Sequence, residues 1–234
     1  MENIVIGVEG LVGSGKTSSC KELLNYVPNS IFLQGGNLYR GIVFALISSG
    51  IDLEHLKESI KYTDIKLIME KLKITLSVED RDTVIYIDGK KVDEVDLQSA
   101  KNSLAVSEIC NVADNQSFYL FARNIIQHFK EKYNVIVSGR DLMKIYPDLD
   151  YHFFFTASLE ERIRKKSLQY EGNIDLLELR ENIITRDNLH RSAGFYKKYD
   201  KTIVVDVTDC KTVLESTQKV FRYINVKSTC VNKK

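Results

Sequence analysis

The residues with the clearest chemical meaning lie near the start of the chain, from Gly10 to Thr17, and read Gly-Leu-Val-Gly-Ser-Gly-Lys-Thr. They match the pattern G-x-x-x-x-G-K-[ST] at every fixed position. Glycines in such a loop let backbone N–H groups converge on a phosphate without a Cβ in the way. A helix that begins at Lys16 would point the positive end of its dipole at the same phosphate. The pattern therefore predicts a site for the phosphates of a nucleoside triphosphate.

Two side chains of this loop have distinct expected roles. Lys16 is expected to lie between the β- and γ-phosphates, and the Thr17 hydroxyl to bind Mg²⁺. Glycine-rich loops also occur by chance, but here an apolar stretch precedes the loop and a helical stretch follows it, as the motif requires. No Asn-Lys-x-Asp occurs in the chain, so a guanine-specific GTPase is not indicated. The predicted nucleotide-binding residues are Gly10, Leu11, Val12, Gly13, Ser14, Gly15, Lys16, Thr17 and Ser18.

Five short apolar stretches alternate with stretches of helical periodicity, which is typical of a parallel sheet with helices on both faces. We therefore expect a single three-layer α/β domain with the P-loop NTPase fold and a five-stranded parallel sheet. Ligands on such a sheet bind at the carboxyl ends of the strands, here the loops after residues 8, 34, 138 and 156. The predicted strands are 3–8, 30–33, 134–137, 151–156 and 202–207, and the later predicted helices lie near 117–132, 158–170, 176–189 and 211–224.

The stretch from about 52 to 113 interrupts this alternation. Its first part, to about residue 73, has helical periodicity. Two alternating strands follow, Ile74–Val78 and Thr83–Ile87, with Asp88-Gly89 as a turn signal, and then a further helical stretch. We interpret residues 52–113 as an insert in the α/β domain.

Several further segments, in order and at plausible distances, resemble motifs of the cytidylate kinase family. After the second strand that family has Asp-[Ser/Thr]-Gly-Ala-x-Tyr-Arg, of which this chain keeps Gly36, Tyr39 and Arg40. The resemblance covers nearly the whole chain, and the ordered co-occurrence of short motifs gives it specificity. The other matching segments are Ile85–Val92, Val137–Asp141, Phe153–Ala157, Ser158–Arg162, Arg186-Asp187 and Val204–Thr208.

The resemblance implies ATP-dependent phosphorylation of CMP or dCMP to CDP or dCDP, with Mg²⁺. It implies that residues 52–113 are a monophosphate-binding insert and that residues 158–195 are a lid that closes to exclude water. The residues expected to stabilise the transferring phosphoryl group are Lys16, Arg140, Arg162 and Arg186. The residues expected to bind the acceptor are Gly36, Tyr39, Arg40, Ser107, Arg140, Asp141 and Arg191.

Most departures from the family pattern concern the acceptor pocket, where Gly35 stands in place of a Ser or Thr. Ser138 replaces an acidic residue at the end of the third strand, at a position that resembles a Walker-B position serving the Mg²⁺ shell. His190 replaces an aspartate that contacts the ribose, and Ala193 replaces a phosphate-binding arginine. Arg191 is a candidate to replace that arginine. These changes bear on cytosine specificity more than on phosphoryl transfer.

Two alternatives to a cytidylate-type kinase remain. One is a P-loop kinase for another small acceptor, and the other is a nucleotide-binding regulatory protein with a degraded acceptor site. The presence of Arg40, Arg140 and Arg162 beside an intact Lys16-Thr17 counts against a regulatory protein. The basic run Arg162–Lys166 is also typical of a solvated helix face.

Composition sets wider limits. The 234 residues are 44% hydrophobic and 28% charged, as in ordinary soluble domains. A formal net charge of +1 gives no sign of binding to nucleic acid or to an acidic membrane surface. The four cysteines form no Cys-x-x-Cys pair, and no apolar run approaches the roughly 20 residues of a membrane span. We expect a cytoplasmic monomer that acts on a small molecule.

Overall fold

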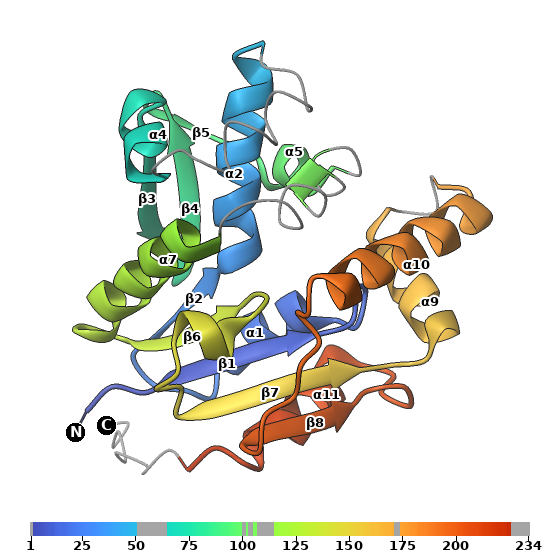
Figure 1. The fold of residues 1–234 in the computed structure, drawn as a ribbon. Coiled ribbons are helices and arrows are strands. Elements are labelled where there is room, and N and C mark those ends of the chain that lie inside the picture. Colours follow the sequence, from blue (N-terminus) through green and yellow to red (C-terminus); the bar gives the residue numbers. More distant parts are fainter. Residues whose placement is uncertain are drawn as a thin grey trace.

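The computed structural model describes residues 2–50, 65–99, 102, 105–106, 115–170 and 174–225 (Figure 1). The predicted acceptor residue Ser107 lies outside these ranges, as does a large part of the predicted insert.

Five neighbouring strands of the sheet are parallel, in the order β2-β6-β1-β7-β8. The five predicted strands and the α/β class are thereby confirmed. All six residues of β1 are buried, because helices cover both faces of a parallel sheet and leave little room for polar side chains. The strands are β1 (Val5–Gly10), β2 (Ser30–Gln34), β6 (Asn134–Ser138), β7 (Tyr151–Thr156) and β8 (Thr202–Asp206).

The hairpin predicted within the insert joins this same sheet, so the sheet has eight strands rather than the five expected. Its second strand lies parallel to β2, where Phe32 pairs with Asp82. The contacts of Arg81, the residue before this strand, hold the strand beside β2. The carbonyl oxygen of Arg81 accepts from Phe32 N (2.8 Å), and its guanidinium donates to the carbonyl oxygens of Ser30 (2.9 Å) and Val27 (3.1 Å). The added strands are β3 (Ile74–Glu79), β4 (Asp82–Ile87) and β5 (Lys90–Lys91).

Helices cover both faces of the sheet, as predicted. On one face, Leu23 and Val220 pack with Phe153 in a fully buried cluster. On the other, Ile126 packs against Val135. The first pair of helices is α1 (Lys16–Leu23) and α11 (Val213–Phe221), and the second is α7 (Asn115–Lys130) and α8 (Leu142–Ile145).

A separate apolar cluster includes side chains of the β3–β4 hairpin. Its buried side chains include Leu38 and Ile42, which come from the helix directly after β2, and Ile85 from β4. The hairpin therefore packs on a helix that precedes residue 52, where the insert was predicted to begin. The helices of this region are α2 (Gly35–Ser48), α4 (Ile65–Lys71) and α5 (Glu94–Gln98). In Figure 1 the helices α2 and α4 lie beside this hairpin.

Two further helices, α9 (Leu159–Gln169) and α10 (Leu176–Ser192), occupy the segment predicted to be the lid. Ser158 caps α9 by accepting from Glu161 N (3.2 Å), and Asp175 caps α10. The apolar side of α10 packs against the glycine-rich loop, because Leu179 and Ile183 form a buried cluster with Val12. Among the described helices, none is both long enough and apolar enough to cross a bilayer.

Candidate active site

The loop between β1 and α1 adopts a backbone conformation that its glycines permit. The φ angles of Gly13 and Gly15 are +77° and +87°, in the left-handed region. Gly10, at φ +142°, lies so close to β7 that a Cβ atom on it would come within 2.2 Å of the Phe155 carbonyl oxygen. No side chain caps α1, so the first N–H groups of that helix remain available to an anion. This geometry fits the phosphate-binding role predicted from the sequence.

The ammonium of Lys16 lies over its own loop, where it donates to the carbonyl oxygens of Gly10 (2.9 Å) and Leu11 (2.7 Å). Burial, followed by repulsion from Arg140, lowers its pKa well below the ordinary value. Among the described residues Lys16 has no carboxylate partner, so a phosphate in the loop would supply the negative charge at this point.

The loop rests on a buried ion pair. Val12 N–H donates to Asp187 Oδ1 (3.0 Å), and Val12 O accepts from a guanidinium nitrogen of Arg162 (3.1 Å). Arg162 in turn pairs with Asp187. Arg162 therefore lies behind the loop and not on the cavity wall, although it was predicted to stabilise the transferring group. Sequence reasoning gave no separate role to Asp187, although its position beside Arg186 was the available signal.

A cavity of about 890 Å³ opens in front of the loop. The helices α2 and α5 stand on one side of it and α9 and α10 on the other (Figure 1). It brings together residues that are far apart in sequence, among them most of those predicted for both substrates. The predicted residues on its wall are Val12, Gly13, Ser14, Gly15, Lys16, Thr17, Ser18, Gly36, Tyr39, Arg40, Arg140 and Arg186.

The cavity wall is strongly cationic. Burial and the charges of neighbouring arginines lower the pKa values of Arg40 and Arg186, and the same two causes lower that of Lys166 to about 8. Among the described residues on the wall, Glu94 is the single carboxylate. Such mutual repulsion is unfavourable for the protein alone and favours the binding of polyanions.

The arginine head groups are held mainly by uncharged partners. Arg40 donates to Asn37 Oδ1 (2.9 Å), while Arg140 donates to the Gly139 carbonyl oxygen (3.0 Å) and to Nδ1 of His190 (3.4 Å). Within the described part of the chain, the buried Nε atoms of Arg40 and Arg186 have no hydrogen-bond partner. Buried donors of this kind are normally paired, so phosphate oxygens are the natural partners here.

Two predicted acceptor residues lie outside this cavity. Asp141 is buried at the start of α8, where it accepts from the Tyr119 hydroxyl and from Lys144 Nζ (2.8 Å). Arg191 is exposed on α10 and donates to Asn188 Oδ1 (3.2 Å). The positions of these two side chains lend no support to a role in acceptor binding.

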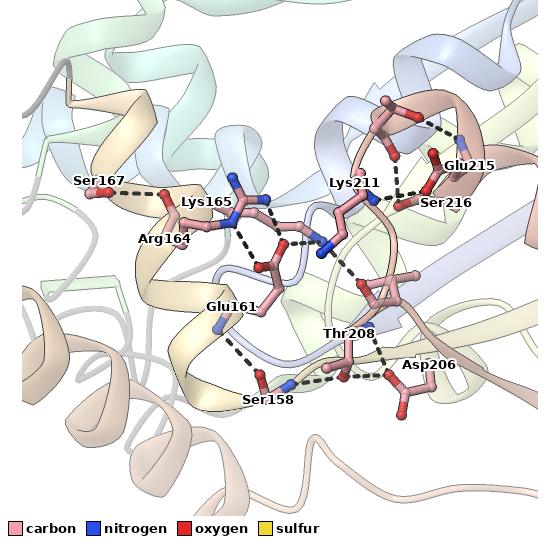
Figure 2. A network of polar contacts seen from close by, with 12 residues as sticks. Ser158, Glu161, Arg164, Lys165, Ser167, Asp206, Thr208, Lys211, Glu215 and Ser216 are labelled. Carbon is pink, nitrogen blue, oxygen red and sulfur yellow. Dashed lines mark hydrogen bonds and ion pairs between the residues drawn. The ribbon is translucent and has the colours of Figure 1, made fainter.

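The first turns of α9 are tied to the loop between β8 and α11 (Figure 2). Glu161 accepts two hydrogen bonds from Arg164, at 2.8 and 2.7 Å, and forms an ion pair with Lys165. Lys165 also donates to the carbonyl oxygen of Val207 (3.3 Å), and Ser158 N donates to Thr208 Oγ1 (3.1 Å). Arg164 and Lys165 line the cavity, so part of the basic run lies on the cavity wall and is also paired with an acid.

A P-loop at the end of a parallel sheet, with a second cluster of arginines lining the same cavity, is the arrangement expected of a P-loop kinase. Comparison with known proteins shows to which family of P-loop proteins the chain belongs. The chain belongs to the cytidylate kinase family, because the family model described as "Cytidylate kinase" matches residues 6–226. Membership supports nucleoside monophosphate kinase activity and confirms the resemblance seen in the sequence.

Individual relatives are distant but cover nearly the whole chain. A protein named "Cytidylate kinase" from Clostridioides difficile (strain 630) is 29% identical over 232 residues, which are 97% of this chain and 100% of that protein. Another of that name, from Pseudothermotoga lettingae, is 28% identical over 98% of this chain and 100% of its own length. The solved structure of TT1252 from Thermus thermophilus covers 95% of this chain and 96% of its own, with 15% identity and a TM-score of 0.47.

Proposed function

We propose that the protein transfers the γ-phosphoryl group of ATP to CMP or dCMP and so forms ADP and CDP or dCDP. The observation that carries this proposal is the cationic cavity, in which Arg40, Arg140 and Arg186 face the P-loop. A single triphosphate site would need the loop cations alone. A second set of arginines supports the binding of a second phosphate, that of an acceptor.

On the donor side, the backbone N–H groups of the loop would bind the β- and γ-phosphates. Lys16 would leave the carbonyl oxygens of its own loop and donate to those phosphates, which raises its pKa again. Asp187 keeps the loop in shape during this exchange, because it holds Val12 N–H from behind. This division gives Lys16 an electrostatic role and Asp187 a supporting one.

On the acceptor side, Arg40 and Arg140 would bind the monophosphate, and Arg186 the group in transfer. The phosphate of the acceptor is already a nucleophile, so positioning and charge stabilisation supply the catalysis. No proton needs to be removed by a strong base. His190, whose pKa is far below its ordinary value, is neutral and fits this mechanism.

Mg²⁺ would supply charge neutralisation to the phosphates when bound. Thr17 lies on the cavity wall and offers its hydroxyl, as does Ser138 at the end of β6. The described residues contain no group of three His, Cys, Asp or Glu side chains that would hold a metal by themselves. This donor set fits a Mg²⁺ ion that arrives with the triphosphate and keeps most of its ligands as phosphate oxygens and water.

Acceptor selectivity is where we expect this protein to differ from a strict cytidylate kinase. Asp141 is engaged with Tyr119 and Lys144 rather than with the cavity, and Gly35 brings no hydroxyl. A site loses discrimination when it loses hydrogen bonds to the base. We therefore propose that other pyrimidine monophosphates are used within about one or two orders of magnitude of CMP, the effect of one or two hydrogen bonds of ~1 kcal/mol each.

The test is a coupled ADP-release assay with CMP, dCMP, UMP, AMP and GMP at matched concentrations. We expect turnover of CMP with a raised KM, and measurable turnover of UMP. Exclusive use of CMP at low KM would show that other residues have rebuilt the pocket. Absence of turnover with all five would indicate a P-loop kinase for a non-nucleotide acceptor and contradict the proposal.

A further inference from the structure

A chain of polar contacts runs from the P-loop through Asp187, Tyr196 and His190 to Arg140 on the cavity wall. It begins at Val12 N–H, which donates to Asp187 Oδ1 (3.0 Å). The Tyr196 hydroxyl donates to the same oxygen (2.5 Å) and lies 3.3 Å from Nδ1 of His190. Arg140 Nε donates to that Nδ1 over 3.4 Å, a long hydrogen bond. His190 therefore lies between Arg140 on the cavity wall and the Tyr196–Asp187 pair that supports the loop.

The contacts of His190 define its protonation. An arginine Nε–H can only donate, so Nδ1 must accept, and the imidazole carries its proton on Nε2. His190 is 6% exposed. Burial, followed by the charges of Arg140 and Arg186, lowers its pKa far below the ordinary value. The ring is thus a neutral acceptor at physiological pH.

We propose that His190 is a positioning residue, whose neutral imidazole orients Arg140 through Nδ1 while the guanidinium charge stays available to the substrate phosphates. The proposal rests on the proposed function, since that function assigns Arg140 to the acceptor. A carboxylate at position 190 would also hold Arg140, but it would neutralise part of the charge of Arg140 and of the nearby Arg186. A neutral acceptor provides orientation without this loss.

Three substitutions at one position separate orientation from charge. His190→Asn places an uncharged oxygen acceptor near the site of Nδ1, His190→Ala removes the acceptor, and His190→Asp adds an anion. His128 is exposed on α7 and lies outside the cavity. His128→Asn and His128→Ala are therefore matched controls, and thermal unfolding of every variant shows whether the fold is kept.

Steady-state kinetics with CMP and ATP give the first readout. We expect His190→Ala to raise the KM for CMP about tenfold, the effect of a lost hydrogen bond to a charged group, with a smaller change in the KM for ATP. His190→Asn should stay within about threefold of the unchanged protein, since it keeps one such acceptor. His190→Asp should be worse than alanine. A His190→Asp variant that uses CMP as well as the unchanged protein would overturn the proposal, as would a folded His190→Asn no better than alanine.

Binding of inorganic phosphate to the protein saturated with ADP, measured by calorimetry, gives a second readout that requires no turnover and leaves the P-loop occupied. We expect the affinity to fall in the order unchanged protein, His190→Asn, His190→Ala, His190→Asp. If this order appears but no nucleoside monophosphate is phosphorylated, the proposed function fails and the role of His190 stands. If CMP is phosphorylated but the order is absent, the proposed function stands and the role of His190 fails.

Discussion

The two walls of the cavity are built in different ways. The wall that we assign to the phosphate donor, called the donor wall, comes from one run of residues, Gly10 to Ser18, and its geometry is mostly backbone: glycine φ angles, a helix start and carbonyl oxygens. The wall that we assign to the acceptor, called the acceptor wall, brings together Arg40, Arg140 and Arg186 from three separate segments, and its geometry is made by side chains. A site made of backbone groups keeps its binding geometry through many side-chain substitutions. A site made of side chains changes its binding groups whenever one of those residues is replaced.

This contrast explains where the chain keeps the family pattern and where it departs from it. The P-loop is complete, and its support behind the wall, Asp187 with Arg162, is buried and ion-paired. Near the wall that we assign to the acceptor, the chain departs from the family pattern at Gly35 and His190, and it departs at Ser138 in the position expected to serve Mg²⁺. From the complete donor wall we expect the same phosphoryl transfer as in the family. From the altered acceptor wall we expect a different preference among acceptors.

The largest expected effect is on the donor wall. Lys16→Ala should lower kcat by about three orders of magnitude or more, because it removes the cation that bears on the β- and γ-phosphates. The fold should remain, since within the described ranges the ammonium donates only to the carbonyl oxygens of Gly10 and Leu11 and to the Ser14 hydroxyl. Single-turnover rates and circular dichroism check both statements. A variant with near-normal turnover would show that the loop is not the site of transfer.

The next largest effect distinguishes the two walls by the ligand whose affinity changes. Arg40→Ala and Arg140→Ala should each weaken the acceptor by about 10- to 150-fold, the worth of a charge-assisted hydrogen bond of roughly 1.5–3 kcal/mol. The affinity for ATP should change much less. Arg123→Ala, on the exposed side of α7, is the matched control. If ATP affinity falls more than acceptor affinity, the assignment of the walls is reversed.

Much of this arrangement could be predicted from the sequence. The five parallel strands and the P-loop follow from local patterns, apolar stretches and glycine spacing. The attachment of β4 to β2 could not be foreseen, because it depends on the contacts of Arg81 with carbonyl oxygens some fifty residues earlier. Arg162 shows the same limit. A basic residue in a motif fits a catalytic or a supporting role equally well, and only burial against Asp187 distinguishes them.

A smaller effect concerns pH. The pKa of Lys166 is lowered to about 8, so this lysine is charged below pH 8 and neutral above it. A phosphate ligand prefers the charged form, and acceptor affinity should therefore fall as the pH rises through 8, by about two- to fivefold for a contact of about 0.5–1 kcal/mol. Lys166→Met should remove this part of the profile, and Lys132→Met, at an exposed site, should not.

Lys166 should affect folding stability in the opposite direction: acceptor affinity falls as the pH rises, whereas the free energy of unfolding increases. Because the unfolded chain binds this proton more tightly than the folded one, stability should rise with pH between about 8 and 10.5. Urea unfolding across this range, with and without Lys166→Met, measures the difference. A profile that is the same in both proteins would show that Lys166 does not titrate in this window.

The smallest effect is expected at Arg191, and it sharpens the limits of the acceptor wall. Arg191 is exposed and lies outside the cavity, whereas Arg186, five residues earlier on the same helix, is buried on its wall. Arg191→Ala should change the acceptor KM by less than about twofold, as for most exposed contacts. Arg186→Ala serves as the comparison and should lower kcat strongly. A large loss in Arg191→Ala would show that closure carries this side chain into the site.

The most direct test of the account follows the transferred group itself. The protein is incubated with ATP labelled at the γ-phosphate and with CMP, and the products are separated. The account predicts that label appears in CDP in one-to-one ratio with ADP and that Lys16→Ala abolishes the transfer. Label released only as inorganic phosphate, at a rate that CMP does not change, would contradict the claim that the second wall binds a phosphate acceptor.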